Sequence, residues 1–423
     1  MVTQPGNRPS AVIVAASVIF IASMTLWPVE AATMSLTSLC VFCGNLGGVD
    51  FALNTVLFVP LGLGLRWLLG NWKTPVLIGA TITLVVETLQ WRIVPGRDAS
   101  LGDLLANTLG TLIGVWLAIE SLRWLNATHV AARRLAGNFG LLAAVVVMGS
   151  AWLLRPALTR QGQYLQWTPT RPHTDLFQGR VSAVDLNGIP VGSFEILLPK
   201  RLLDTNGTQS VRAVINGPVP VPRRKAIIVV SANRFEEGFT IAQWREALVF
   251  RSRVAGALFK LHSPGVELEN GLAPAIHGDG DQGSSMTIEA RSTPRAISVR
   301  RETADSENAV TLRRTVGLAW ALLLPWDIAI GPAWWPVNAA WLATIMIPVS
   351  FFTIRSGRKA PADSKGSGVS WWPFALTLVA FAAAPVVTGL SALGPGEWLG
   401  LLLGVGTGAA IERFSAPREP VVS

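Results

Sequence analysis

Polar and ionisable side chains recur at helical spacing inside an otherwise apolar stretch, residues 50–114. Members of a pair three or four residues apart share one face of a helix. The pairs are Asp50 with Asn54, Glu87 with Gln90, and Asp103 with Asn107. Carboxylates can serve as general acids and bases. Placing an ionisable group near lipid costs free energy, so such groups are expected to have a function. This stretch is therefore the first candidate for a site.

The short segment between the second and third pairs adds charge. It contains Arg92, Arg97 and Asp98. An Arg there could hold a phosphate or a carboxylate, because its planar guanidinium matches both groups. The name polar cluster is used below for the eight candidate binding residues, which are Asp50, Asn54, Glu87, Gln90, Arg97, Asp98, Asp103 and Asn107. Glu87 and Asp103 are the candidate catalytic carboxylates.

The composition predicts a membrane protein. Of 423 residues, 50% are hydrophobic and only 14% are charged, against about 25% charged in soluble domains. There are 17 Trp and one Tyr, and many Trp residues flank apolar runs, as in an interfacial aromatic belt. About 20 apolar residues span a bilayer as a helix. The runs long enough are 11–28, 50–69, 74–91, 101–120, 138–154, 335–354, 371–391 and 396–412.

The pattern divides the chain into three regions. Residues 1–155 form a helical membrane domain of about five helices, 156–313 an all-β domain, and 314–423 about three further helices. The first run could also be a signal peptide, but its long apolar core favours a retained helix. The run 315–331 is interrupted by Pro325, Asp327 and Pro332, so it is expected to be re-entrant or interfacial.

Basic residues in short loops predict the orientation, because they favour the cytoplasmic side. Arg8, Arg66, Lys73 and Arg123 lie in or beside loops on one side, whereas the loop 29–49 contains no Lys or Arg. The chain is therefore expected to lie in the plasma or inner membrane, with a cytoplasmic N-terminus and an extracytoplasmic β-domain. In that orientation the three polar pairs all lie at the outer ends of their helices.

Residues 156–313 contain short β-rich runs separated by Gly, Pro and Asn, which is typical of a β-sandwich. Asn187-Gly188 predicts a hairpin turn. Asp279 and Asp281 in a glycine-rich loop could bind calcium, although two acids are fewer than its usual oxygen ligands. The fold class expected is thus an α-helical polytopic membrane protein with an inserted, jelly-roll-like β-sandwich.

Four segments together resemble the VanZ-like family, small multi-helix membrane proteins named for a teicoplanin-resistance determinant. They are Asp50-Phe-Ala-Leu-Asn54, Glu87-Thr-Leu-Gln90, Arg97-Asp98-Ala-Ser100 and Asp103-Leu-Leu-Ala-Asn107. The resemblance covers roughly residues 10–155 and implies a cell-envelope protein linked to glycopeptide tolerance. The β-domain more loosely resembles laminin-G-like or concanavalin-A-like sandwiches, which implies carbohydrate binding.

Three functions are compatible with these residues. The first is recognition of an envelope glycan, a lipid headgroup or a lipid-linked wall precursor. The second is an enzyme in which Glu87 or Asp103 acts as general base on such a substrate. The third is a structural scaffold, since buried polar groups need partners in any fold. Membrane lipid is an expected partner of all three.

Other chemistries find little support in the sequence. It contains no zinc-hydrolase motif, P-loop, Rossmann glycine pattern, nucleophile elbow or nucleic-acid motif. The four His residues are scattered, so neither a metal site nor a cofactor is expected. Cys40 and Cys43 form an isolated CxxC pair, which could be a labile disulfide outside the membrane or simply two small apolar residues.

Overall fold

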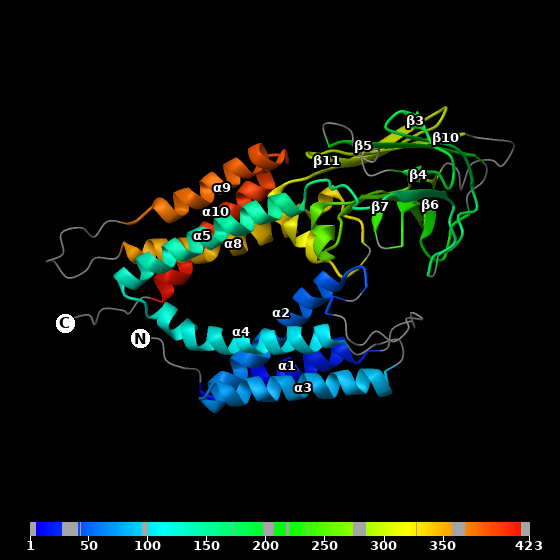
Figure 1. Ribbon diagram of the computed structural model, residues 1–423. Coiled ribbons are helices and arrows are strands. Elements are labelled where there is room, and N and C mark those ends of the chain that lie inside the picture. The colour runs from blue at the N-terminus through cyan, green and yellow to red at the C-terminus, as the bar shows by residue number, and fades with distance from the viewer. Residues whose placement is uncertain are drawn as a thin grey trace, which may run out of the picture. The chain divides into compact units, whose positions relative to one another are not determined.

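The computed structural model describes residues 6–27, 41–42, 44–94, 100–171, 173–197, 207–216, 220–234, 236–273, 285–326, 328–357 and 369–415. Within them, long helices precede and follow a region of strands (Figure 1). The chain divides into two compact units, one of residues 1–139, 348–373 and 406–423, and the other of residues 140–347 and 374–405.

All eight predicted helical segments are helices. They are α1 (Asn7–Thr25), α2 (Gly47–Leu69), α3 (Lys73–Arg92), α4 (Leu101–Leu125), α5 (His129–Leu153), α8 (Trp335–Ser356), α9 (Trp372–Thr388) and α10 (Pro395–Phe414). Six helical segments are long and apolar enough to cross a membrane, namely α1 to α5 and residues 332–356. α9 is apolar but shorter. The protein is therefore a helical membrane protein.

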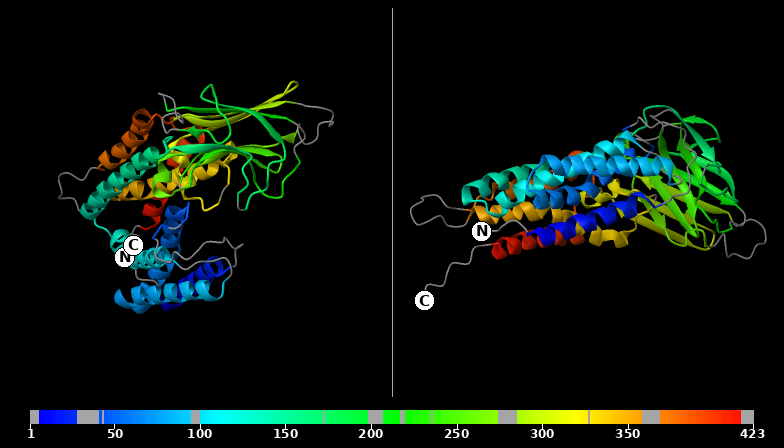
Figure 2. Two further views of the ribbon diagram at one scale, coloured as in Figure 1. Left: turned by 45° about the vertical axis from the view of Figure 1, so that its right-hand side comes forward. Right: turned by 90° about the horizontal axis from the view of Figure 1, so that it is seen from below.

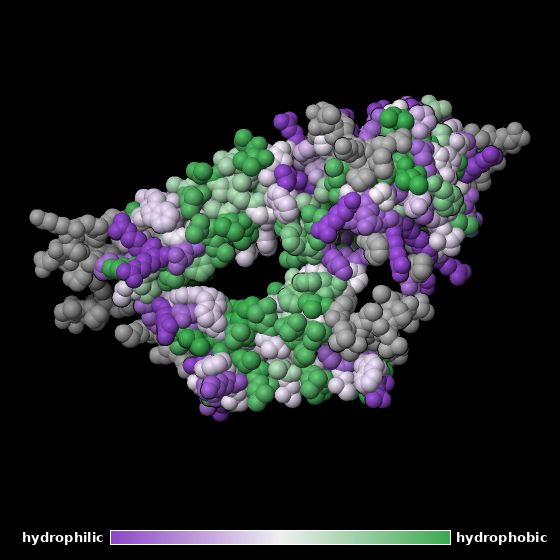
Figure 3. Space-filling model, in the orientation of Figure 1, coloured by the Kyte–Doolittle hydropathy of each residue, from purple (hydrophilic) through white to green (hydrophobic). Residues whose placement is uncertain are grey.

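In the first unit, α1, α2, α3 and α4 lie side by side (Figures 1 and 2). Their buried centre is apolar and includes Ile21, Phe58, Leu61 and Val86. The surface over these helices is largely hydrophobic, and hydrophilic residues gather near the helix ends (Figure 3). That distribution suits helices whose middles face lipid and whose ends face water.

Close contact between α2 and α4 depends on glycine. A Cβ at Gly110 would overlap the carbonyl oxygen of Thr55, and a Cβ at Gly114 would overlap that of Val59. Gly62 on α2 meets the backbone of Thr111 in the same way. Gly110 and Gly114 have the GxxxG spacing, in which small residues let two helix backbones approach closely.

The second unit contains the β-domain. Its first sheet has the order β4-β1-β6-β7-β8-β9 and its second sheet the order β12-β11-β10-β5-β2-β3. All strand pairs are antiparallel. The strands are β1 (Gln163–Trp167), β2 (Arg180–Leu186), β3 (Ile189–Pro190), β4 (Ile196–Leu197), β5 (Gln209–Asn216), β6 (Ala226–Ala232), β7 (Glu237–Trp244), β8 (Ala247–Ser252), β9 (Gly265–Leu268), β10 (Met286–Ser292), β11 (Ala296–Glu302) and β12 (Glu307–Arg313).

Side chains along a strand point alternately to its two faces, and the inward-pointing residues of the two sheets form one core. Val211, Ala213 and Ile215 of β5 are buried in the same cluster as Phe239 and Ile241 of β7. The predicted all-β domain between the fifth helix and the C-terminal helices is confirmed. Asn187 and Gly188 both have positive φ, 52° and 79°, which fits the predicted hairpin turn between β2 and β3.

The segment after β12 forms no α-helix in its described part. It contains a short 3₁₀ helix, η2 (Val316–Leu323), whose side chains join the buried core. Two hydrogen bonds attach it to the helices that follow: the Thr315 hydroxyl donates to Glu397 of α10, and Trp320 Nε1 donates to Asn338 Oδ1 of α8 at 2.8 Å. The described part of this segment is therefore packed and hydrogen-bonded to α8 and α10.

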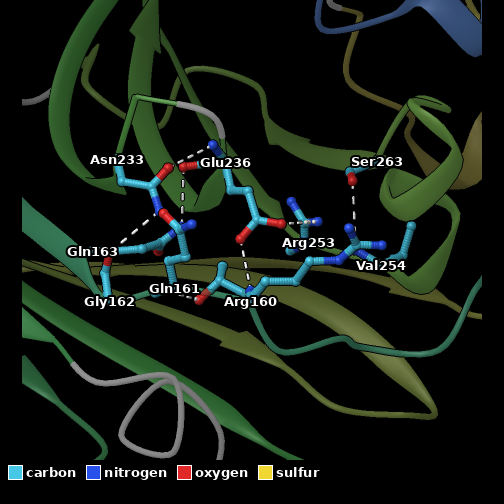
Figure 4. Close-up of polar contacts among 10 residues, drawn as sticks. Arg160, Gln161, Gly162, Gln163, Asn233, Glu236, Arg253, Val254 and Ser263 are labelled. Atoms are coloured by element: carbon cyan, nitrogen blue, oxygen red, sulfur yellow. Dashed lines mark hydrogen bonds and ion pairs between the residues drawn. The ribbon is translucent and has the colours of Figure 1, made fainter.

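A buried ion pair fastens the start of the β-domain (Figure 4). Arg253 Nη2 lies 3.0 Å from Glu236 Oε1, and the two side chains are 7% and 13% exposed. The second oxygen of Glu236 accepts from the backbone N–H of Arg160 at 2.7 Å. The carbonyl of Glu236 accepts from Gln163 Nε2 at 3.0 Å. Glu236, in the β6–β7 turn, thus contacts both the segment that follows α5 and the residue after β8.

Replacing Gly114 with Ala should lower the midpoint of thermal unfolding of the purified protein in detergent. Overpacking at such a contact costs about 1–3 kcal/mol. The matched control is Gly149→Ala on α5, where nothing lies within 4 Å of an added Cβ. An equal effect of the two substitutions would show that the α2–α4 contact does not require glycine.

Removing one partner of the Glu236–Arg253 pair should destabilise the protein strongly. Because the remaining charge stays buried, Arg253→Met should cost about 3 kcal/mol or more. The combined variant with Glu236→Gln should recover part of that loss. Arg300→Met is the control, since its pair with Glu307 is 43% and 55% exposed and such pairs contribute about 0–1 kcal/mol. Thermal unfolding of all three variants would reject this role if Arg253→Met behaved like the control.

Candidate functional site

The polar cluster is organised around the first turn of α4. Ser100 is the N-cap of α4, and its hydroxyl oxygen accepts from the backbone N–H of Asp103 at 2.9 Å. The backbone N–H of Ser100 donates to Glu87 Oε2 on α3 at 2.8 Å. Glu87 therefore belongs to the cap of the neighbouring helix, although 13 residues separate it from Ser100.

The Asp103 carboxylate contacts another helix. Asp103 occupies the third position of α4, from which an acidic side chain commonly reaches back to the N-cap N–H. Because Glu87 already accepts from that N–H, Asp103 instead accepts from Asn54 Nδ2 of α2 at 2.6 Å. The Glu87 carboxylate thus joins α3 to Ser100 at the start of α4, and the Asp103 carboxylate joins α4 to α2. Together they connect three helices at one end of the bundle.

Gln90 connects the same region to α1. Its side-chain Nε2 donates to the carbonyl of Thr25, in the last turn of α1, at 2.8 Å. Glu87 and Gln90 are 7% and 6% exposed, so both side chains are buried between helices. The predicted pair on α3 therefore does point inward, and its two members contact different neighbouring helices.

A line of polar side chains extends inward from the carboxylates between α3 and α4. Gly79 contacts Thr111 at one level, and Glu87 contacts Ser100 at the level nearer the helix ends. The antiparallel course of these helices places Thr83 and Asn107 between those levels. Thr83 is fully buried and Asn107 is 1% exposed. We call Glu87, Thr83, Asp103 and Asn107 the polar seam.

Two atoms of the polar seam have no hydrogen-bond partner among the described residues, Thr83 Oγ1 and Asn107 Oδ1. Each lies one helical turn below a carboxylate, since Thr83 precedes Glu87 by four residues and Asn107 follows Asp103 by four. A buried polar group without a partner costs about 1–3 kcal/mol. The seam can therefore accept a donor from water or from a ligand with a gain in free energy.

The other predicted site residues have different positions. Asp50 is exposed in the first turn of α2. Arg92 is not in the loop as predicted but in the last turn of α3, where its guanidinium lies 4.2 Å from the Trp91 ring centroid. Arg92 is helical because α3 continues for two residues beyond Gln90 before the chain turns. Arg97 and Asp98 lie outside the described residues, as do Cys40, Cys43, Asp279 and Asp281.

Two participants were not among the predicted site residues. Ser100 hydrogen-bonds to the Glu87 carboxylate and to the backbone N–H of Asp103, and the pattern Ser100-x-x-Asp103 is a sequence signal of a helix N-cap. Thr83 is the second, and its spacing of four residues from Glu87 is the sequence signal that places both on one face of α3. No group of three or more His, Cys, Asp or Glu that could hold a metal occurs within the described part of the chain.

Comparison with known families bears on this bundle. Residues 8–125 match the family VanZ/LLP1. No curated protein and no solved structure matches the chain. The matched residues are those of α1 to α4, which contain the described members of the polar cluster. This protein is therefore a membrane protein whose first four helices form a VanZ-like domain.

Proposed function

We propose that the VanZ-like domain recognises the polar head of a cell-envelope component, a lipid-linked wall precursor or an envelope glycan, and so contributes to tolerance of glycopeptides such as teicoplanin. The observation that carries this proposal is the polar seam. Its two carboxylates come from different helices, and beneath them lie two buried oxygen atoms without partners in the described residues. Packing alone gives no reason for those two atoms.

The chemistry of the seam favours a ligand rich in hydrogen-bond donors. Carboxylate and amide oxygens accept hydrogen bonds, and sugar hydroxyls and peptide N–H groups supply them. Asn54 and Asp103 are only half buried, and Asp50 is exposed nearby on α2. A headgroup could therefore approach from the helix ends and extend inward toward Asn107. Its lipid tail would remain in the membrane beside the apolar surface of the helices.

The proposed orientation is consistent with that approach. Basic residues concentrate in the loops that we assign to the cytoplasm, which puts the N-terminus inside the cell and the β-domain outside. The end of the polar seam formed by Glu87 and Asp103 then lies on the extracytoplasmic side, as does the β-domain. Glycans and wall precursors are exposed in that compartment, whereas nucleotides and nucleic acids are not.

One observation favours catalysis as a second candidate function. Glu87 and Asp103 contact the same residue, yet Glu87 is buried and accepts a backbone N–H, whereas Asp103 is half buried and accepts a side-chain amide. Two carboxyl groups in unlike surroundings can divide the roles of general acid and general base. Chemical change of the bound component would distinguish an enzyme from a recognition protein.

Glu87→Gln and Asp103→Asn should each weaken binding of a lipid-linked disaccharide-peptide precursor to the purified full-length protein by about tenfold or more. A hydrogen bond to a charged group contributes about 1.5–3 kcal/mol, and 1.4 kcal/mol corresponds to a factor of ten. Both substitutions preserve side-chain shape. In cells that produce the protein, the same variants should lower the teicoplanin concentration that stops growth.

The matched control is Glu120→Gln, at the opposite end of α4, where Glu120 pairs with Arg123 at 2.8 Å. It changes the same chemical group on the same helix and should alter neither readout. Membrane levels of all variants are measured in parallel. Unchanged binding and unchanged tolerance in both seam variants would leave the carboxylates with a purely structural role. Conversion of the precursor by the wild type alone would establish the enzyme.

A further inference from the structure

An exposed apolar face runs along the described second half of α5 to its last turn. Leu141, Val145 and Trp152 are spaced by four and seven residues, so they share one face of the helix. Their exposed fractions are 59%, 59% and 38%. Because α5 is long and apolar enough to cross a membrane, this face is expected to contact acyl chains. Trp152, one residue before the helix ends at Leu153, then lies at the level of the lipid headgroups.

A short turn of the β-domain lies against this end of α5. It is the 3₁₀ helix η1 (Ala255–Phe259), which follows β8. The backbone N–H of Ala255 donates to the carbonyl of Arg155 at 2.8 Å. A Cβ at Gly256 would lie 3.5 Å from the carbonyl oxygen of Leu153. The first two residues of η1, both buried, therefore fix the turn against the chain that leaves α5.

Phe259, at the other end of η1, is apolar and exposed. Its ring centroid lies 6.2 Å from that of Trp152, and the two rings are inclined by 65° in an edge-to-face contact. Phe259 is still 57% exposed, although Trp152 covers one side of it. The two rings therefore extend the apolar face of α5 onto the β-domain, in the zone where membrane proteins collect aromatic side chains.

Arg155 adds a positive charge beside these rings. Its Cζ lies 5.6 Å from the Trp152 ring centroid, a cation–π contact that keeps the guanidinium at the end of the helix. The side chain is half-buried, and its Nε is buried without a hydrogen-bond partner among the described residues. No acidic side chain in the described part of the chain pairs with it. An external anion can therefore neutralise this charge.

We propose that Arg155, Trp152 and Phe259 bind an anionic phospholipid of the leaflet at this end of α5. The guanidinium pairs with the phosphodiester, because the planar fork of an arginine matches two phosphate oxygens. The two rings contact the glycerol and the first acyl carbons. A phospholipid suits both parts of the site, since a free anion leaves the exposed rings uncovered and an apolar protein segment leaves the charge of Arg155 unpaired.

Continuity and charge decide which lipid suits the site. The rings continue a helix face that already faces acyl chains, so a lipid beside Leu141 and Val145 places its headgroup beside Arg155. A zwitterionic headgroup brings an ammonium that already neutralises its phosphate, whereas an anionic headgroup leaves a net negative charge for the guanidinium. The site lies outside residues 8–125, which match the VanZ/LLP1 family, and the inference does not depend on the proposed function of that domain.

The test measures lipid binding to the full-length protein in detergent by native mass spectrometry. The probes are phosphatidylglycerol and phosphatidylcholine with the same acyl chains. The first phosphatidylglycerol should bind the wild type about tenfold more tightly than phosphatidylcholine, because it gains a charge-assisted pair. Arg155→Gln should abolish that preference, whereas Arg155→Lys, which keeps the charge, should retain part of it. Phe259→Ser should weaken both lipids about fivefold and leave the preference unchanged, because it removes only apolar contact.

The matched control is Arg123→Gln, since Arg123 is an exposed arginine near the end of α4 that already pairs with Glu120 at 2.8 Å. It should change neither affinity, and thermal unfolding without lipid checks that every variant folds. Equal affinity of the wild type for the two lipids, an unchanged preference in Arg155→Gln, or unaltered binding in Phe259→Ser would overturn the proposal. So would displacement of the lipid by inorganic phosphate, which would indicate a free-phosphate site, or a dimer that Trp152→Ala dissociates, which would indicate a second copy of the chain.

Discussion

The hydrogen bond from the backbone of Ser100 to the buried carboxylate of Glu87 is the contact on which the polar cluster depends. It satisfies an N–H at the start of α4, where water would otherwise be needed. It also places Ser100 so that its hydroxyl caps Asp103. With the cap complete, the Asp103 carboxylate is directed to Asn54 of α2. One buried acceptor on α3 thus sets the position of α4 and the hydrogen-bonding direction of its acid.

Close approach of α2 and α4 is the second requirement. Hydrogen bonds between side chains as short as those of Asn54 and Asp103 need helix backbones that lie near each other. Gly62, Gly110 and Gly114 allow this, because side chains at these positions would overlap backbone carbonyl or adjacent atoms. In a membrane the hydrophobic effect does not drive helices together, so packing and polar contacts carry more of the association. The glycines and the Asn54–Asp103 hydrogen bond therefore both hold α2 against α4.

The β-domain meets the same physical demand with different means. Its first sheet is buried on both faces along β6, β7 and β8, so polar groups there must find partners within the protein. Glu236 does so through Arg253, Arg160 and Gln163. His262, also buried in this domain, keeps its Nε2 without a partner in the described residues.

Periodicity and composition in the sequence were sufficient for the eight helices, the intervening sheets and the Asn187-Gly188 turn, because each depends on local spacing and apolar character. Polar pairs at helical spacing also predicted Glu87, Asp103 and Asn107 as candidate site residues. The sequence could not show that Glu87 caps another helix, that Thr83 joins the seam, or that Glu236 contacts both Arg253 and Arg160. Those relations bring together residues distant in the chain, and only the packing of helices and the register of strands decide them.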